Sequence, residues 1–156
     1  MAGSLSVPVR KAVIAGLRTH LEGLPAFNAT AAEDEVTVEY AFGFGQQHRQ
    51  RIYTGRSSAD TGSAGMRAGR NFRNEVGTFA LIVRVEMPDT TQEEADTRVD
   101  EIGVQVEEWI ADRKSDQLGI GLTSLYVTGW SGDYFGVTNG AGSIRQYTVR
   151  WTARLT

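Results

Sequence analysis

The side chains that most often carry catalysis or bind metals are scarce in this sequence. It has no cysteine and two histidines, His20 and His48, which excludes disulfides, thiolate nucleophiles, Fe–S clusters and sites built from several cysteines or histidines. His48 could serve as a general base, but no nucleophile or metal partner accompanies it. His20 lies off the apolar stripe of a predicted helix, so a surface or capping role is expected. The acidic run 33–35 could bind a cation, although such a run is more often a solvated approach to a strand.

Known catalytic and ligand-binding signatures are also missing. The sequence contains no phosphate-binding loop, dinucleotide-binding glycine motif, metalloprotease helix, serine-hydrolase elbow or calcium loop. Gly43-Phe44-Gly45 lacks a third glycine and follows a predicted strand without opening a helix, so a tight turn explains it better. The residues therefore indicate no catalytic, cofactor-binding or metal site.

Length and composition predict one α+β domain over residues 1–156. A chain of 156 residues, 40% hydrophobic and 22% charged, can bury its own core. The net charge of −3 does not by itself indicate a nucleic-acid or membrane partner. The longest apolar run, Phe79–Val83, is far shorter than the ~20 residues of a membrane span, and no secretory signal is visible. We expect a soluble protein made in a cytoplasm.

Two helices are predicted from apolar residues that recur every three or four positions. The first covers Val9–Leu21, with Ser6 as its N-cap and a stop at Gly23. The second follows a capping box formed by Thr91 and Glu94. It buries a stripe of apolar residues, Ala95, Val99, Ile102, Val106, Trp109 and Ile110, and ends near Arg113 and Lys114, where cations favour the helix dipole.

Five strands are predicted from alternating apolar and polar residues. Tyr147, Val149 and Trp151 mark one face of the last strand, and Thr148 and Arg150 mark the other. A glycine-rich turn, 131–143, is expected to join the last two strands. The predicted fold is a mainly antiparallel sheet, with the long helix packed across it and a shorter N-terminal helix. The strands are expected at Val36–Phe42, Arg49–Thr54, Phe79–Met87, Leu122–Trp130 and Ile144–Leu155.

An irregular, Arg- and Gly-rich loop is predicted at about residues 55–74, where no periodicity is visible. From His48 to Arg73, six arginines accompany one acid, Asp60. From Glu86 to Asp116 the balance reverses, with eleven acids and three bases. The long helix is therefore expected to expose an acidic face, and the loop is expected to be basic.

Three interpretations of this charge division stay open. Both segments could be solvated surface. The arginines could bind nucleic acid, although only Phe72 interleaves with them and the acidic helix would repel a polyanion. Finally, the basic loop of one copy could meet the acidic helix of another, because head-to-tail contacts can close into rings.

The third interpretation defines a candidate interface with a second copy or with another assembly protein. Trp130, Tyr134 and Phe135 flank the predicted glycine-rich turn and are either packed beneath it or form an aromatic contact patch. The candidate interface residues are Arg49, Arg51, Arg56, Arg67, Arg70, Arg73, Glu94, Glu101, Glu108, Tyr134 and Phe135.

The order of elements resembles the tail terminator proteins of long-tailed bacteriophages, also called tail completion or head-to-tail joining proteins. The resemblance covers nearly the whole chain. It rests on an N-terminal helix, a strand, a hairpin with a long polar loop, and a strand that ends in proline before DTTQEEADTRVDEIGVQVEEWI. Another strand, a turn with GWSGDYFG and the closing strand RQYTVRWTARL follow.

The resemblance implies an α+β protein without enzyme activity or cofactor. Members of the family form hexameric rings that cap the growing tail tube, end its polymerisation and present a surface to the head. The expected partners are further copies of the chain, the major tail tube protein and the head–tail connector protein, with neither a membrane nor nucleic acid expected. The expected location is the head-proximal end of the virion tail, reached from the host cytoplasm during assembly.

Other functions compete with this one. Within the same kind of particle, a neck or connector-stopper protein or a tail tube protein would suit the charge division as well. A nucleic-acid-binding module would use the arginine loop against phosphates. A small hydrolase would need His48 and a carboxylate in one pocket.

Overall fold

The computed structural model describes residues 4–28, 35–42, 49–67, 70–113, 118 and 120–155, with only the backbone for 61–67, 70–73 and 155. Its strands form one five-stranded sheet in the order β1-β2-β3-β5-β4. β1 pairs with β2 in parallel, and the other neighbours are antiparallel. The predicted α+β class with a mainly antiparallel sheet is confirmed. The elements are α1 (Ser6–Glu22), β1 (Val36–Glu39), β2 (Gln50–Arg67), β3 (Arg70–Pro88), α2 (Gln92–Ala111), β4 (Leu122–Val137) and β5 (Gly140–Leu155).

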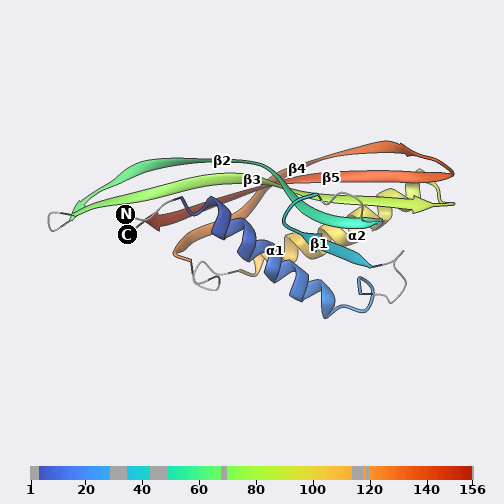
Figure 1. Cartoon of the computed structure of the whole chain (residues 1–156), viewed down its shortest axis with the longest axis horizontal. Helices are drawn as coiled ribbons and strands as arrows, with labels where there is room; N and C mark the ends of the chain where they lie inside the picture. Colours follow the sequence, from blue (N-terminus) through green and yellow to red (C-terminus); the bar gives the residue numbers. More distant parts are fainter. Residues whose placement is uncertain are drawn as a thin grey trace.

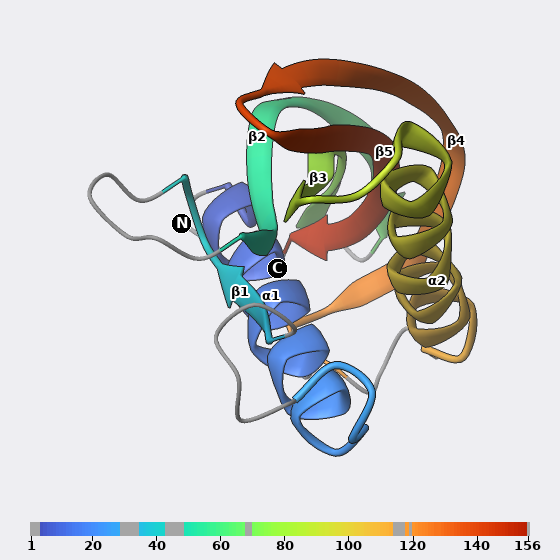
Figure 2. The same cartoon turned by 90° about the vertical axis from the view of Figure 1, so that its right-hand side faces the viewer.

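Both helices lie on the same face of the sheet (Figure 1). α2 packs against β3, β5 and β4, whereas α1 packs against β1 and β2 (Figure 2). The alternation predicted for the last strand is confirmed, because Tyr147, Val149 and Trp151 are buried on the helical face of the sheet. Thr148 and Arg150 are exposed on the other face.

The core lies between the helices and the sheet, and both predicted apolar stripes contribute to it. Ile102 and Val106 of α2 are fully buried, as predicted. The helices meet where Gly16 of α1 faces the indole ring of Trp109, and a methyl group on Gly16 would overlap that ring. The glycine therefore allows a close approach of the helices. No helix in the described part of the chain has the length and apolarity needed to cross a membrane.

The helix ends agree with the sequence only in part. Thr91 caps α2 as predicted, with its hydroxyl oxygen accepting a hydrogen bond of 3.3 Å from the Glu94 N–H. The predicted N-cap at Ser6 is wrong, because α1 already begins at that residue and Leu5 occupies the cap position. The Leu5 N–H donates instead to a carboxylate oxygen of Glu75 on β3, at 2.6 Å.

At its other end, α2 stops earlier than predicted. The helix ends at Ala111, with Asp112 as its C-cap. Arg113 thus lies beyond the helix, where its guanidinium carbon is 4.8 Å from the centre of the Trp109 ring. Lys114 lies outside the described residues.

The loop predicted at about 55–74 is wrong, because β2 and β3 continue through most of it as an antiparallel hairpin. The pairing extends to Arg67 opposite Arg70, with register shifts at Thr54/Ser57 and Ser63/Gly65. Backbone hydrogen bonds hold such a ladder together whatever the side-chain pattern. The described side chains of 56–60 are exposed, so this part of β2 lacks the alternation that identifies a half-buried strand.

The predicted glycine-rich turn at 131–143 is wrong for the same reason. β4 continues to Val137 and β5 starts at Gly140, so only Thr138 and Asn139 connect them. Asn139 has a φ of 56°, a left-handed conformation that asparagine tolerates in tight turns. At the other edge, β1 ends at Glu39 rather than Phe42.

Candidate functional site

The side chains with possible catalytic chemistry do not gather into a site in the described part of the chain. His20 is half-buried between the helices, where its Nε2 lies 3.1 Å from Gln105 Oε1. It therefore joins α1 to α2 rather than capping a helix. His48 and residues 33–34 lie outside the described residues. Among the described residues, no three His, Asp or Glu side chains lie close enough together to hold a metal ion.

The basic residues predicted for the interface differ in their surroundings. Arg49 is half-buried and Arg51 is only 8% exposed, with its guanidinium carbon 4.8 Å from the centre of the Phe42 ring. Arg51 therefore offers little surface to a partner, whereas Arg56 is exposed. The other three, Arg67, Arg70 and Arg73, lie on the backbone of the β2–β3 hairpin, and their side chains lie outside the described part.

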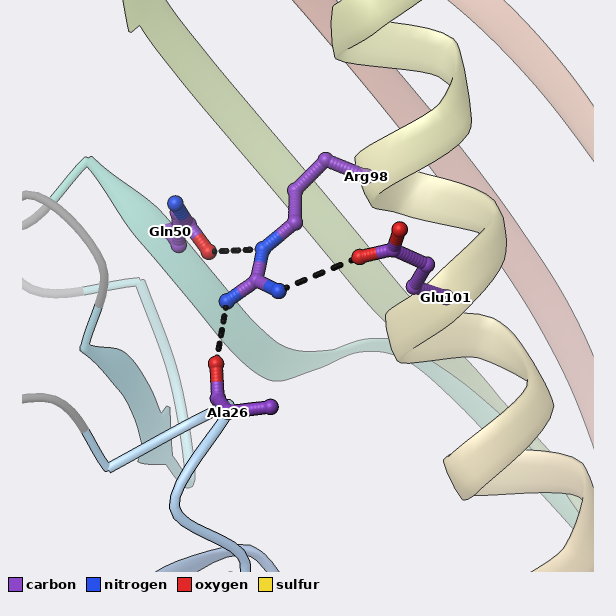
Figure 3. A network of polar contacts seen from close by, with 4 residues as sticks. All are labelled: Ala26, Gln50, Arg98 and Glu101. Carbon is purple, nitrogen blue, oxygen red and sulfur yellow. Dashed lines mark hydrogen bonds and ion pairs between the residues drawn. The ribbon is translucent and has the colours of Figure 1, made fainter.

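The acidic residues Glu94, Glu101 and Glu108 are exposed on α2. Glu101 already has a partner within the chain, because Arg98 Nη1 lies 3.2 Å from its carboxylate. Figure 3 shows that Arg98 also donates to Gln50 Oε1 at 2.7 Å and to the Ala26 carbonyl at 3.0 Å. Sequence reasoning missed this residue, which ties α2 to β2 and to the segment after α1.

The aromatic residues of β4 form an exposed patch rather than a buried cluster. Tyr134 is 72% exposed and Trp130 is 54% exposed. Phe135 differs from them, because it is half-buried with the Arg84 guanidinium carbon 4.5 Å from its ring centre. Of the two interpretations that the sequence left open, a contact patch therefore fits Trp130 and Tyr134, and a packed position fits Phe135.

Arg145 of β5 fixes the position of the Trp130 ring. Its guanidinium carbon lies 3.9 Å from the ring centre, within cation–π distance. The same guanidinium donates to Asp100 of α2 at 2.6 Å and to the Tyr147 hydroxyl at 3.4 Å. Burial alone would lower the pKa of Arg145, but these two hydrogen bonds outweigh it and raise the pKa. Burial raises the pKa of Tyr147, whose hydroxyl oxygen accepts the hydrogen bond from Arg145.

A groove runs between α2 and β4 and contains this patch. Its floor and walls include Asp96 and Val99 from α2, Trp130 and Tyr134 from β4, and Ser143 from β5. The groove is acidic, since Asp96 of α2 lines it and its basic residue, Arg145, is paired with Asp100. We call it the Trp130 groove.

The acids predicted for the interface lie elsewhere on α2. Glu94 and Glu101 line a different hollow, together with Met87 and Thr91. The structure therefore does not bring them together with Tyr134, although the sequence grouped them in one interface. The helical spacing could have separated them, because Asp96, Asp100 and Glu107 recur on the side of α2 that faces β4.

Two strand edges of the sheet are without a partner strand in the described structure. β4 is the outermost strand on one side, and its register with β5 is unbroken from Gly129 to Val137. On the other side, β1 pairs only with Gln50–Tyr53 of β2, which leaves the rest of β2 as an edge. Unpaired N–H and C=O groups along an edge are available to a strand of another chain.

Comparisons with known proteins identify a structural relative only. The chain is similar to a chain in the virion of a native gene transfer agent particle, with a TM-score of 0.58 and 17% sequence identity. The alignment covers 96% of this chain and 100% of that chain. No protein-family profile matches the sequence, and no curated protein matches it. At this identity the similarity establishes a shared fold.

Proposed function

We propose that this chain is a structural protein of a phage-like virion, and specifically the tail terminator that caps the tail tube and joins the tail to the head. The observation that carries the proposal is the similarity in fold, along the whole length of both chains, to a chain of a gene transfer agent virion. The order of helices and strands that resembles tail terminators is also the order found in the structure, although the expected long polar loop is largely part of the β2–β3 hairpin.

Self-assembly into a ring is part of this proposal, and the arrangement of strand edges supports it. The edge on β4 and the edge on the outer half of β2 lie on opposite sides of one sheet. A contact between two different edges is heterologous, so repeating it produces a closed ring when the rotation between copies closes. We propose a hexamer, as the resemblance implies, with further contacts to the major tail tube protein and the head–tail connector protein.

Deleting the gene for this chain from the genome that encodes the particle tests this function. Without a terminator, tubes should grow beyond their normal length and remain separate from DNA-filled heads, as seen by electron microscopy. Expression of the chain from a plasmid should restore joined particles of normal tail length. A plasmid carrying Val106→Asp, which places an unpaired carboxylate in the core, is the matched control and should not restore them.

The alternatives give different outcomes in the same experiment. The absence of any tubes would identify a tail tube protein. Tails of normal length beside heads that have lost their DNA would identify a neck or connector-stopper protein. Intact, joined particles would refute a structural role in the virion. For a nucleic-acid-binding module, the purified chain should bind DNA with an affinity that falls steeply as salt rises.

A further inference from the structure

We propose that the Trp130 groove binds the outer end of the β2–β3 hairpin, residues 56–73, of a second copy of this chain. We call this end of the hairpin the basic arm. The inference rests on the proposed self-assembly and adds to it the position of the contact and the segment that fills it.

The Trp130 groove is preorganised for contact. Arg145 holds the Trp130 ring from one side and is itself held by Asp100 and Tyr147. A large aromatic ring that is fixed before binding loses little conformational entropy when a partner covers it. Such rings, together with arginines, dominate the energetics of protein interfaces. The exposure of Trp130 and Tyr134 side by side therefore indicates a contact surface.

The charge of the groove selects the kind of partner. Asp96 lines it, and Glu107 lines the continuation of the same side of α2 beyond Trp130. The basic group in the lining, Arg145, already has Asp100 as its counter-ion. The groove therefore favours a segment that combines positive charge with apolar side chains.

The basic arm has this composition. Its sequence contains Arg56, Arg67, Arg70 and Arg73 with one acid, Asp60, and it includes Met66 and Phe72. Arg67 and Arg70 are register partners at the end of the hairpin. The acidic lining of the groove therefore complements the charge of the arm.

The arm cannot reach the groove of its own chain. Through the strand register, Tyr134 is opposite Ser143, and Ser143 is opposite Val85 of β3. Arg70 stands at the start of β3, roughly 50 Å of extended strand away from Val85 at about 3.3 Å per residue. Figure 1 shows the paired outer ends of β2 and β3 at one end of the sheet and the turn between β4 and β5 at the other. The arm of one copy can therefore fill only the groove of another, which is the head-to-tail contact that a ring requires.

Photo-crosslinking tests the contact. Tyr134 is replaced by p-benzoylphenylalanine in the full chain, and the assembly state is measured by sedimentation before irradiation. We expect a covalent dimer in which mass spectrometry joins position 134 to a peptide from residues 56–73. The matched control places the same group at Thr148, which is exposed on the face of the sheet opposite the helices. It should give no crosslink to the arm.

A double cysteine variant tests the same contact if the bulky p-benzoylphenylalanine side chain disturbs assembly. Because the chain has no cysteine, Asp96→Cys together with Arg67→Cys should form disulfide-linked multimers under mild oxidation, whereas each single variant should give dimers at most. If rings assemble but their crosslinks map outside the arm, the proposed contact is refuted and the proposed ring is not. A chain that stays monomeric at every concentration would refute both the contact and the proposed ring.

Discussion

Gly16 is expected to be the position where helix propensity and packing have opposite effects. In the interior of a helix, Gly→Ala stabilises by about 1 kcal/mol. At Gly16, however, the new methyl group would overlap the indole ring of Trp109, which is only 4% exposed. Overpacking a dense core costs about 1–3 kcal/mol. We therefore expect Gly16→Ala to destabilise the protein by about 0–2 kcal/mol.

A double-mutant cycle separates the two effects. In a Trp109→Leu background the ring is gone, so Gly16→Ala should stabilise by the full ~1 kcal/mol of helix propensity. Ala15→Gly, at an exposed position on the same helix, gives the propensity term alone with the opposite sign. Thermal melting followed by circular dichroism measures all four combinations. For a domain of this size, 1 kcal/mol corresponds to about 2–4 °C in Tm.

The result that would refute this reasoning is a Gly16→Ala protein that melts higher than the wild type by the same margin in both backgrounds. The indole would then move aside without cost, and the close approach of α1 and α2 would not be the reason for the glycine. A crystal structure of the variant would show whether the two helices had separated.

Other predictions follow from the core, the hairpin and the titrating groups. Val106→Asp should abolish the cooperative melting transition, because it buries a charge at a fully buried site. Replacing residues 63–73 with an Asn-Gly turn should leave Tm within a few degrees and abolish assembly in sedimentation, since β5 pairs with β3 chiefly beyond this segment. Burial raises the pKa of Tyr147 and of Tyr53, so stability should fall as the pH rises above ~10, and less in Tyr147→Phe under alkaline melting. His48→Ala should support particle assembly as the wild type does in the plasmid assay.

The elements that the sequence predicted best are those with one buried and one solvated side. α2 and β5 lie against each other across the core, so their apolar residues recur with the helical and strand periods. The capping threonine of α2 also acts locally, through a bond three residues along the chain. Local signals of this kind can be read without knowledge of the fold.

The extent of the hairpins could not be predicted, because their outer parts have weak side-chain periodicity. The side chains of residues 56–60 are exposed on both faces of the sheet, and those of residues 128–134 are exposed too. Gly, Ser and Thr in such a segment are typical of a loop, yet the segment pairs through its backbone. Ser58 and Thr78 are register partners in this pairing of β2 with β3, and their hydroxyl oxygens also lie 3.1 Å apart.

The polar contacts that shape the candidate site connect distant parts of the sequence. Arg145 and Asp100 are 45 residues apart, and Arg98 and Gln50 are 48 residues apart. Composition identified Arg98 only as a base within an acidic segment. Its pairing with Glu101 reduces the charge that this segment offers to a partner, and this effect appears only in the folded chain.

The position of the helices explains why a single copy presents so much surface for contact. α1 and α2 cover one face of the sheet and leave both strand edges open, one on β4 and one on the outer half of β2. Long open edges promote uncontrolled association unless something covers them. The edges here differ in charge, because the Trp130 groove beside β4 is acidic and the basic arm includes β2. In the contact we propose, a second copy would cover an open edge and complement its charge at the same time, which would favour ordered head-to-tail assembly over aggregation between like edges.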